Sequence, residues 1–156
     1  MFFSCATYKA QYQNNSSSSK KPLSKEISHT FYLIGDAGNA NLNQSTPALN
    51  LLKDDLSKAD KNGTLIFLGD NIYPKGLDKK SELSKHRLQA QIDLGKSFKG
   101  NTIFLPGNHD WYSGLDALKD QEKMVEKALG KDSFLPENGC PIEKVSISDD
   151  IILIVI

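Results

Sequence analysis

The chain has 156 residues, of which 38% are hydrophobic and 24% charged, and its 19 Lys and Arg side chains balance its 19 Asp and Glu side chains. The length suits one ordinary domain, and a formal net charge of +0 gives no electrostatic basis for binding nucleic acid. The longest apolar run, residues 151–156, is too short for a membrane helix. Two cysteines, Cys5 and Cys140, exclude a disulfide framework and a cysteine zinc site.

Residues 1–28 differ in composition from the rest of the chain. Residues 14–21 read NNSSSSKK, which is typical of a disordered polar linker. The short apolar stretch before Cys5 resembles the end of a bacterial lipoprotein signal, although only four residues precede this cysteine and none of them is basic. We therefore expect a linker over residues 1–28, in which Cys5 is either a free thiol or the site of a lipid anchor, and a folded domain over residues 29–156.

Apolar, β-branched runs alternate with stretches of helical periodicity from residue 29 onward. In chain order, the predicted elements are a buried strand at 30–34, a helix from 47 to a stop at 63, a strand at 64–68, a helix at 81–98, a strand at 101–105, a helix from 113 to 130, a loop at 131–141, and a hairpin of 145–148 and 151–156. Thr46 is the expected N-cap of the first helix, and residues 113–116 resemble a capping box for the third.

The order β-α-β-α-β-α-β-β predicts an α/β fold with a mainly parallel sheet. Strands that alternate with helices are joined by crossover connections, which make neighbouring strands parallel. The carboxyl ends of such strands meet at one edge of the sheet, where ligand sites form.

Each of the three predicted parallel strands is followed by glycine and polar residues. The segments are GDAG at 35–38, GDNIY at 69–73 and GNHD at 107–110. They bring two carboxylates, a phenol, an amide oxygen and an imidazole to one edge, from Asp36, Asp70, Tyr73, Asn108 and His109. Each residue alone is more often a turn, cap or surface residue. Their joint occurrence at strand ends favours a metal site, because hard cations prefer oxygen ligands and a cation removes the repulsion between carboxylates.

These segments resemble the first three motif blocks of the calcineurin-like metallophosphoesterases, over about residues 31–112. Most of that superfamily has Asp-x-His in the first block, whereas this chain has Asp36-Ala37-Gly38. The purple acid phosphatase branch has glycine there and uses a tyrosine from the second block, which Tyr73 matches. The resemblance implies the N-terminal half of a two-sheet sandwich flanked by helices.

The resemblance also implies roles for the five residues. Asp36 and Tyr73 would bind a first metal ion, Fe(III) in the family. Asp70 would bridge two ions, and Asn108 would bind the second, divalent ion (Fe, Zn or Mn). A metal-bound hydroxide would then hydrolyse a small phosphate monoester, while His109 assists the leaving group. A phenolate ligand favours a trivalent ion, because free tyrosine has a pKa near ~10.

The family takes further ligands from two later histidine blocks, and this chain has no histidine after His109. His29 is expected on a strand edge and His86 on a solvated helix face. The apolar run 151–156 calls for neighbouring strands. We therefore expect the sequence to be the N-terminal part of a longer phosphatase, and this chain alone to bind metal weakly and turn over poorly.

Three other functions stay open at this point. One is a phosphodiesterase or nucleotidase of the same superfamily, and another is a non-catalytic protein that keeps the metal-binding residues. The third, a nucleotide-binding α/β domain, is disfavoured because its glycine-rich fingerprints are missing. Since the family is usually exported, we expect the protein in the cell envelope or secreted, with membrane contact only through a lipid on Cys5.

Overall fold

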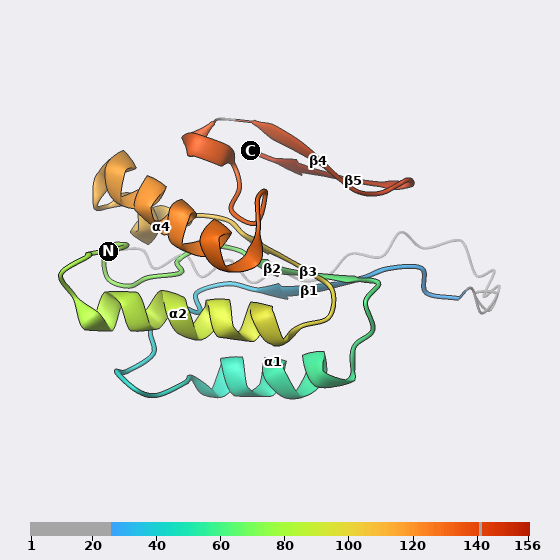
Figure 1. Ribbon diagram of the computed structural model, residues 1–156, viewed down its shortest axis with the longest axis horizontal. Coiled ribbons are helices and arrows are strands. Elements are labelled where there is room, and N and C mark those ends of the chain that lie inside the picture. The colour runs from blue at the N-terminus through green and yellow to red at the C-terminus, as the bar shows by residue number, and fades with distance from the viewer. Residues whose placement is uncertain (1–25, 141) are drawn as a thin grey trace, which may run out of the picture.

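The computed structural model describes residues 26–140 and 142–156. The lipoprotein-like segment at Cys5 and nearly all of the linker expected over residues 1–28 lie outside the described residues. The elements, in chain order, are β1 (Thr30–Ile34), α1 (Pro47–Lys58), β2 (Gly63–Phe67), α2 (Glu82–Ser97), β3 (Asn101–Phe104), α3 (Asn108–Trp111), α4 (Gly114–Leu129), the 3-10 helix η1 (Glu137–Gly139), β4 (Glu143–Ser148) and β5 (Ile151–Val155) (Figure 1). Across this part of the chain, no helix combines the length and apolar composition that crossing a bilayer requires.

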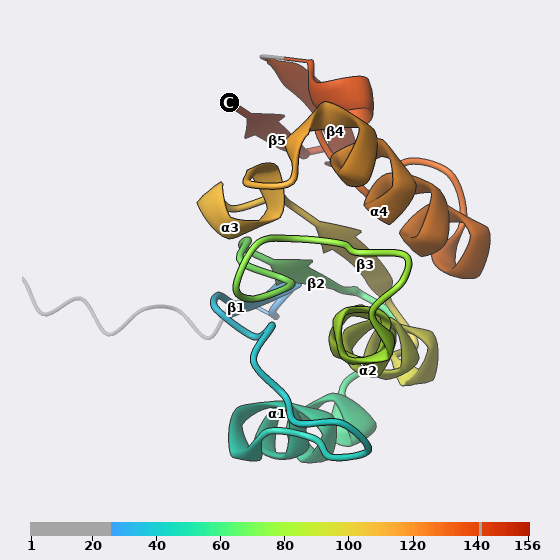
Figure 2. The same cartoon turned by 90° about the vertical axis from the view of Figure 1, so that its left-hand side faces the viewer.

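The strands β1, β2 and β3 form a parallel sheet with β2 in the centre, which confirms the predicted α/β fold. Phe31 pairs with Thr64, which in turn pairs with Asn101, so the three strands run in step. The pairing continues past the strand ends, where the Leu68 amide donates to the Ile34 carbonyl at 2.8 Å. The following loops therefore leave the sheet at one edge and lie next to one another, with α3 beside them (Figure 2).

The sheet lies between a layer of helices and the antiparallel β4–β5 hairpin. Alternate residues of a strand point to opposite faces. On one face, Phe67 and Phe104 stack with ring centroids 4.3 Å apart and contact a cluster that includes side chains of α1, α2 and α4. On the other face, Ile66 and Ile103 pack with Val155 and other side chains of the hairpin. Figure 1 shows α1 and α2 on one side of the sheet and the hairpin on the other.

The N-cap hydrogen bond of α1 follows the prediction, whereas α4 begins after Ser113 as predicted but without the predicted cap hydrogen bonds. The Leu49 amide donates to the Thr46 hydroxyl at 3.2 Å, which confirms Thr46 as the N-cap. The capping box predicted at residues 113–116 is wrong. The Ser113 hydroxyl makes no cap bond and donates instead to the Lys75 carbonyl, so tertiary contact with the loop after β2 replaces the local cap. The four-residue helix α3 was not predicted, because so short a helix has no apolar period.

Two further expectations are corrected by the structure. β1 is not a buried strand, since Phe31 and Leu33 are 38% and 59% exposed on the face where the hairpin packs only against β2 and β3. The loop predicted at 131–141 contains η1 and a short extended segment. Phe134 forms a parallel bridge with Phe104, and the Leu135 amide donates to the Phe104 carbonyl at 2.9 Å. The two apolar side chains Phe134 and Leu135 explain this order, because both are fully buried.

Candidate metal centre at the strand ends

Asp36 and Asp70 each follow a glycine just beyond a strand, and both have left-handed backbone conformations, with φ of 56° and 53°. Such values are uncommon for residues other than glycine, and aspartate is among those that adopt them most readily. Conformations of this kind persist only where the surrounding structure holds them, and they cluster at functional sites. Here the Asp36 amide donates to the Gly69 carbonyl at 3.1 Å, and the Gly38 amide donates to the Asp70 carbonyl at 3.1 Å.

Glycines allow the three loops to pack backbone against backbone. A Cβ on Gly38 would lie 2.2 Å from the main-chain carbonyl carbon of Asn71. A Cβ on Gly107 would lie 2.3 Å from both the main-chain nitrogen and a carboxylate oxygen of Asp70. Neither position accommodates a side chain without displacing the loop opposite it. The close approach therefore explains why glycine stands at both positions.

Tyr73 joins the two carboxylates. Its hydroxyl lies 2.6 Å from Asp36 Oδ1 and 3.1 Å from Asp70 Oδ2. The hydrogen bond to Asp36, followed by burial, the hydrogen bond to Asp70 and the charges of both carboxylates, raises the pKa of Tyr73 well above its usual range. The phenol carries a single proton and can donate it to only one carboxylate at a time. While the phenol donates to one of the two carboxylates, the other lies near that carboxylate without a hydrogen bond from Tyr73.

His109 and Asn108 complete the edge of the site. The His109 amide donates to Asp70 Oδ1 at 3.0 Å, and its imidazole Nδ1 bonds to the Pro74 carbonyl. Because a carbonyl only accepts, Nδ1 carries a proton and Nε2 is the nitrogen left for chemistry. The ring lies against Tyr73 at 4.4 Å and against Tyr112 at 4.8 Å between centroids.

The Asn108 amide group is oriented by a neighbour. Its Nδ2 donates to the Tyr112 hydroxyl at 2.7 Å, which leaves Oδ1 as the atom available to a ligand. The structure thus links Asp36, Asp70 and Tyr73 directly through side-chain hydrogen bonds. It places His109 beside them through its amide bond to Asp70, whereas the side chain of Asn108, the first residue of α3, hydrogen-bonds to Tyr112 rather than to these three residues.

Asp110 is the last residue of the GNHD segment at 107–110, and no role was predicted for it from the sequence. It is fully buried, and its carboxylate accepts the amides of Gly107 at 2.8 Å, Asn71 at 3.0 Å and Ile72 at 3.1 Å. Burial raises the pKa of Asp110 above its usual value, and the N–H donors of Gly107, Asn71, Gln121 and Ile72 offset only part of that rise. The sequence offers no signal for this role, because a buried and an exposed aspartate after a histidine look alike.

The donor set fits a cation. Within residues 26–140 and 142–156, no three His, Cys, Asp or Glu side chains lie close enough together to hold a metal ion. The oxygens at the strand ends come instead from two carboxylates, a phenol and an amide, and only the carboxylates belong to those residue types. Two carboxylates that share one phenol proton are poorly compensated, and a hard cation with oxygen ligands relieves that repulsion.

Two histidines lie elsewhere, as expected from their positions in the sequence. His29 Nε2 bonds to the Thr64 hydroxyl at 3.0 Å, near the start of β2 and at the opposite end of the sheet. The half-buried His86 on α2 bonds through Nε2 to the Gln44 carbonyl at 2.9 Å. Neither contacts the strand ends.

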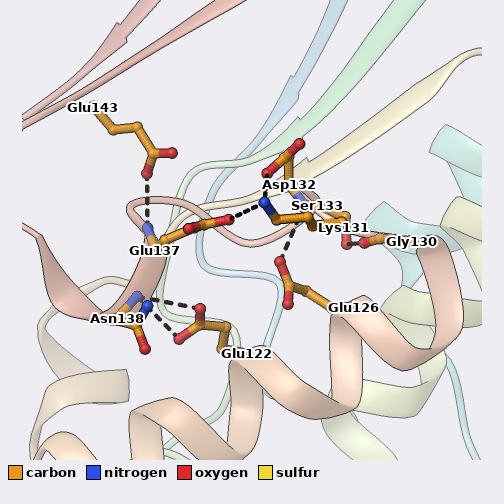
Figure 3. A network of polar contacts seen from close by, with 9 residues as sticks. All are labelled: Glu122, Glu126, Gly130, Lys131, Asp132, Ser133, Glu137, Asn138 and Glu143. Carbon is orange, nitrogen blue, oxygen red and sulfur yellow. Dashed lines mark hydrogen bonds and ion pairs between the residues drawn. The ribbon is translucent and has the colours of Figure 1, made fainter.

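A second acidic region joins α4 to the segment around η1 (Figure 3). Both carboxylate oxygens of Glu122 accept the Asn138 amide at 3.2 Å, and Glu126 accepts the Asp132 amide at 3.1 Å. Glu143 accepts the Glu137 amide at 2.7 Å. We call this region the α4–η1 network. Its carboxylates hold main-chain donors in place, which is a structural role.

Comparison with known proteins agrees with the geometry of the strand ends. A family model described as calcineurin-like phosphoesterase matches residues 29–150, which is most of the chain and contains all five candidate residues. No curated protein and no solved structure matches the chain significantly.

Proposed function

The chain belongs to the calcineurin-like phosphoesterase family, and from that membership we propose that it hydrolyses small phosphate monoesters with two metal ions held at the ends of β1, β2 and β3. The family is one of metal-dependent phosphoester hydrolases that generally bind two ions. The monoester substrate and the purple acid phosphatase type are the finer parts of the proposal. The observation that carries them is the phenol of Tyr73 within hydrogen-bond distance of both Asp36 and Asp70.

Gly38 supports the assignment to the purple acid phosphatase branch. The common first block of the superfamily would place a histidine at this position. A Cβ there would lie 2.2 Å from the Asn71 carbonyl carbon, so no histidine fits without moving the loop after β2. The phenol of Tyr73 reaches the same carboxylates from that loop and takes the place of the missing imidazole.

In this proposal Asp36 and Tyr73 would hold one ion, Asp70 would contribute to both, and Asn108 would hold the second through its Oδ1. Bound ions would lower the pKa of a bound water and neutralise charge on the phosphoryl oxygens. The raised pKa of Tyr73 means that its proton must leave before the oxygen can act as a ligand. That cost favours a strongly Lewis-acidic ion such as Fe(III) at the Asp36 and Tyr73 side of the site, with a divalent Fe, Zn or Mn ion beside Asn108.

His109 assists the departing alkoxide. The bond from Nδ1 to the Pro74 carbonyl fixes the ring, and contacts with Tyr73 and Tyr112 limit its rotation. In the imidazolium form, which carries a proton on both nitrogens, the Nε2 proton is available to the leaving oxygen, and its loss leaves the neutral ring with Nδ1–H still bonded to Pro74. The His109 amide, which donates to Asp70, keeps the imidazole close to the carboxylates.

The metal assignment is tested by titrating the purified protein with Fe(III) and then with Zn²⁺ or Mn²⁺. We expect a visible phenolate-to-iron charge-transfer band that disappears in Tyr73→Phe and stays in Tyr112→Phe. A band that is unchanged in Tyr73→Phe would remove the phenol from the site.

The reaction is tested by comparing nitrophenyl phosphate with its bis ester and with an alkyl phosphate. We expect monoester hydrolysis to predominate, and His109→Gln to slow the alkyl phosphate more than the nitrophenyl ester, because a poor leaving group depends more on proton donation. His86→Gln is the matched control and should change neither rate. Preference for the bis ester would favour a phosphodiesterase, and metal binding without hydrolysis of either ester would favour a non-catalytic protein.

A further inference from the structure

Asp110 gathers an unusual number of donors for one side chain. It is fully buried, and its Oδ2 accepts the amides of Gly107 at 2.8 Å and Asn71 at 3.0 Å together with Asn71 Nδ2 at 3.3 Å. Its Oδ1 accepts the Ile72 amide at 3.1 Å and Gln121 Nε2 at 3.2 Å. All five contacts are N–H donors, which is the environment that an ionised carboxylate requires.

The donors come from the segments that carry the candidate site. Asn71 and Ile72 are the two residues between Asp70 and Tyr73, and Gly107 directly precedes Asn108. Asp110 therefore fastens the loop after β2 to the loop after β3. Its position on α3 places it between the two, 38 and 39 residues along the chain from the amides of Ile72 and Asn71 that it accepts.

Neighbouring contacts stiffen the same connection. Gln91 Nε2 on α2 donates to the Asn71 carbonyl at 2.7 Å, and Asn71 Nδ2 donates to the Leu105 carbonyl at 2.7 Å. A Cβ on Gly76 would lie 2.5 Å from the Asp110 carbonyl oxygen, so the loop after β2 closes directly onto α3. Asp110 is the charged centre of this arrangement.

An isosteric amide cannot replace this carboxylate. Asparagine would present an NH₂ group to one set of N–H donors, so at least one buried main-chain amide would lose its acceptor. An unsatisfied buried donor is costly, and the loop relieves that cost by moving. Such a movement displaces Asp70 and Tyr73 relative to Asn108.

We propose that Asp110 is a positioning residue that sets the separation of the two loops and thereby the metal affinity of the strand-end site. Asp110 acts through the backbones of Asn71, Ile72 and Gly107, and touches neither substrate nor metal. The part of the proposal that concerns metal affinity rests on the proposed function, whereas the part that concerns the loops does not.

The test compares Asp110→Asn with the unmodified protein in two measurements. The first is amide hydrogen exchange of the metal-free chain, and the second is isothermal titration with Mn²⁺ alone. We expect faster exchange at Asn71, Ile72 and Gly107 than in the unmodified chain, with the Leu68 amide unchanged. We also expect the Mn²⁺ affinity to fall by about tenfold or more, the size of effect seen when groups that orient metal ligands are removed.

Val125→Ala is the matched control for stability. Val125 is fully buried on α4 and belongs to the apolar cluster, so its truncation weakens the fold without touching Asp110. We expect Val125→Ala to lower the unfolding midpoint while the Mn²⁺ affinity stays within twofold. Equal loss of affinity in both variants, or unchanged loop exchange in Asp110→Asn, would overturn the positioning role.

A second pair of variants decides the question if Asp110→Asn does not fold. Gln121→Leu removes one donor to Asp110 Oδ1 from the same helix face as Val125, which lies four residues further along. We expect lower Mn²⁺ affinity and faster exchange of the Ile72 amide in Gln121→Leu than in Val125→Ala, and equal values would overturn the proposal. If the unmodified protein binds no Mn²⁺, the proposed function fails, and the exchange measurements still decide whether Asp110 holds the loops.

Discussion

The strand-end site and the α4–η1 network, the second of which is drawn in Figure 3, both concentrate acidic side chains but provide them with different hydrogen-bond donors. In the α4–η1 network the carboxylates of Glu122, Glu126 and Glu143 each accept a main-chain amide, and the Lys131 ammonium lies 3.6 Å from the Glu137 carboxylate. At the strand ends, among the contacts of the described residues, the Asp36 carboxylate has only the Tyr73 hydroxyl as a donor, whereas the Asp70 carboxylate shares that hydroxyl and also accepts the His109 amide.

This difference separates a structural acidic cluster from a site prepared for a cation. Carboxylates that hold backbone amides add to stability without any ligand. Carboxylates that face each other across one proton lower stability until a cation arrives. The left-handed backbone conformations of Asp36 and Asp70 also cost free energy, and such conformations cluster at functional sites. The number of acidic residues in a cluster is therefore a poor guide to a metal site. A better guide is whether the carboxylates have too few hydrogen-bond donors from the protein itself.

The largest effect that sharpens this comparison is expected from Asp70→Asn. Asparagine keeps the left-handed backbone and an oxygen for the His109 amide, but it removes one charge from the pair. We expect the metal affinity measured by isothermal titration to fall by at least about 100-fold. The free energy of unfolding of the metal-free chain should rise, because the repulsion with Asp36 is gone. A lower free energy of unfolding of metal-free Asp70→Asn would show that the Asp70 carboxylate stabilises the fold, as the network glutamates do, and would contradict the comparison.

Gly38→Ala is expected to have the next largest effect. The added Cβ would lie 2.2 Å from the Asn71 carbonyl carbon, so the loops must separate, and we expect a loss of about 3 kcal/mol in urea unfolding. Gly35→Ala is the control, because its Cβ would meet only Leu68 Cβ at 3.8 Å, an ordinary contact. Similar losses in the two variants would mean that close packing of the loops is not what requires Gly38.

Glu122→Gln tests the structural side of the comparison. Glu122 is buried, and glutamine keeps one oxygen for the Asn138 amide but loses the charge. We expect a loss of about 1 kcal/mol in urea unfolding with no change in metal affinity. Glu82→Gln, which breaks an exposed ion pair with Lys85 and removes a negative charge from the first turn of α2, should lower the free energy of unfolding by less. A gain in stability in Glu122→Gln would show that the charge of Glu122 destabilises the fold, as is expected for Asp36 and Asp70.

The smallest effect concerns the pH dependence of Glu126. Burial, with smaller contributions from the charges of Glu122, Glu137 and Asp132, raises the pKa of Glu126. A raised pKa in the folded state adds stability below the unfolded value of 4.5, and this contribution is lost as pH rises through the folded value.

The free energy of unfolding of Glu126→Gln, measured in urea, should therefore rise relative to that of the unmodified chain as the pH is raised from about 4 to about 7. Glutamine does not titrate, so the variant does not lose the stability that the unmodified chain loses when the Glu126 carboxyl ionises. The Glu82→Gln variant provides the baseline for a substitution on an exposed helix surface. A difference between Glu126→Gln and the unmodified chain that stays constant with pH would contradict this reading of Glu126.

Much of the sheet and of the candidate site was predictable from local sequence. The apolar runs before Gly35, Gly69 and Gly107 predict three strands, and their alternation with helices predicts parallel pairing. Parallel strands bring their carboxyl ends to one edge. The meeting of Asp36, Asp70 and Tyr73 therefore follows from chain order and strand geometry.

Partners distant in the chain were not predictable. Whether Ser113 caps α4 or bonds to Lys75, and whether Phe31 is covered by the hairpin, depends on segments that only the folded chain brings together. Local patterns carry no information on such contacts, because the same residue types suit either outcome.

The sequence by itself determined which residues stand at the strand ends, since the order of strands and helices leaves their side chains one edge to share. The tertiary structure alone decided how those residues are held: the single phenol proton between two carboxylates, the glycines pressed against opposite backbones, and the buried Asp110 that fastens two loops. The physical reason is that strand pairing is dictated by patterns a few residues long, whereas a buried charge acquires its partners only when distant backbone amides are brought around it and shielded from water.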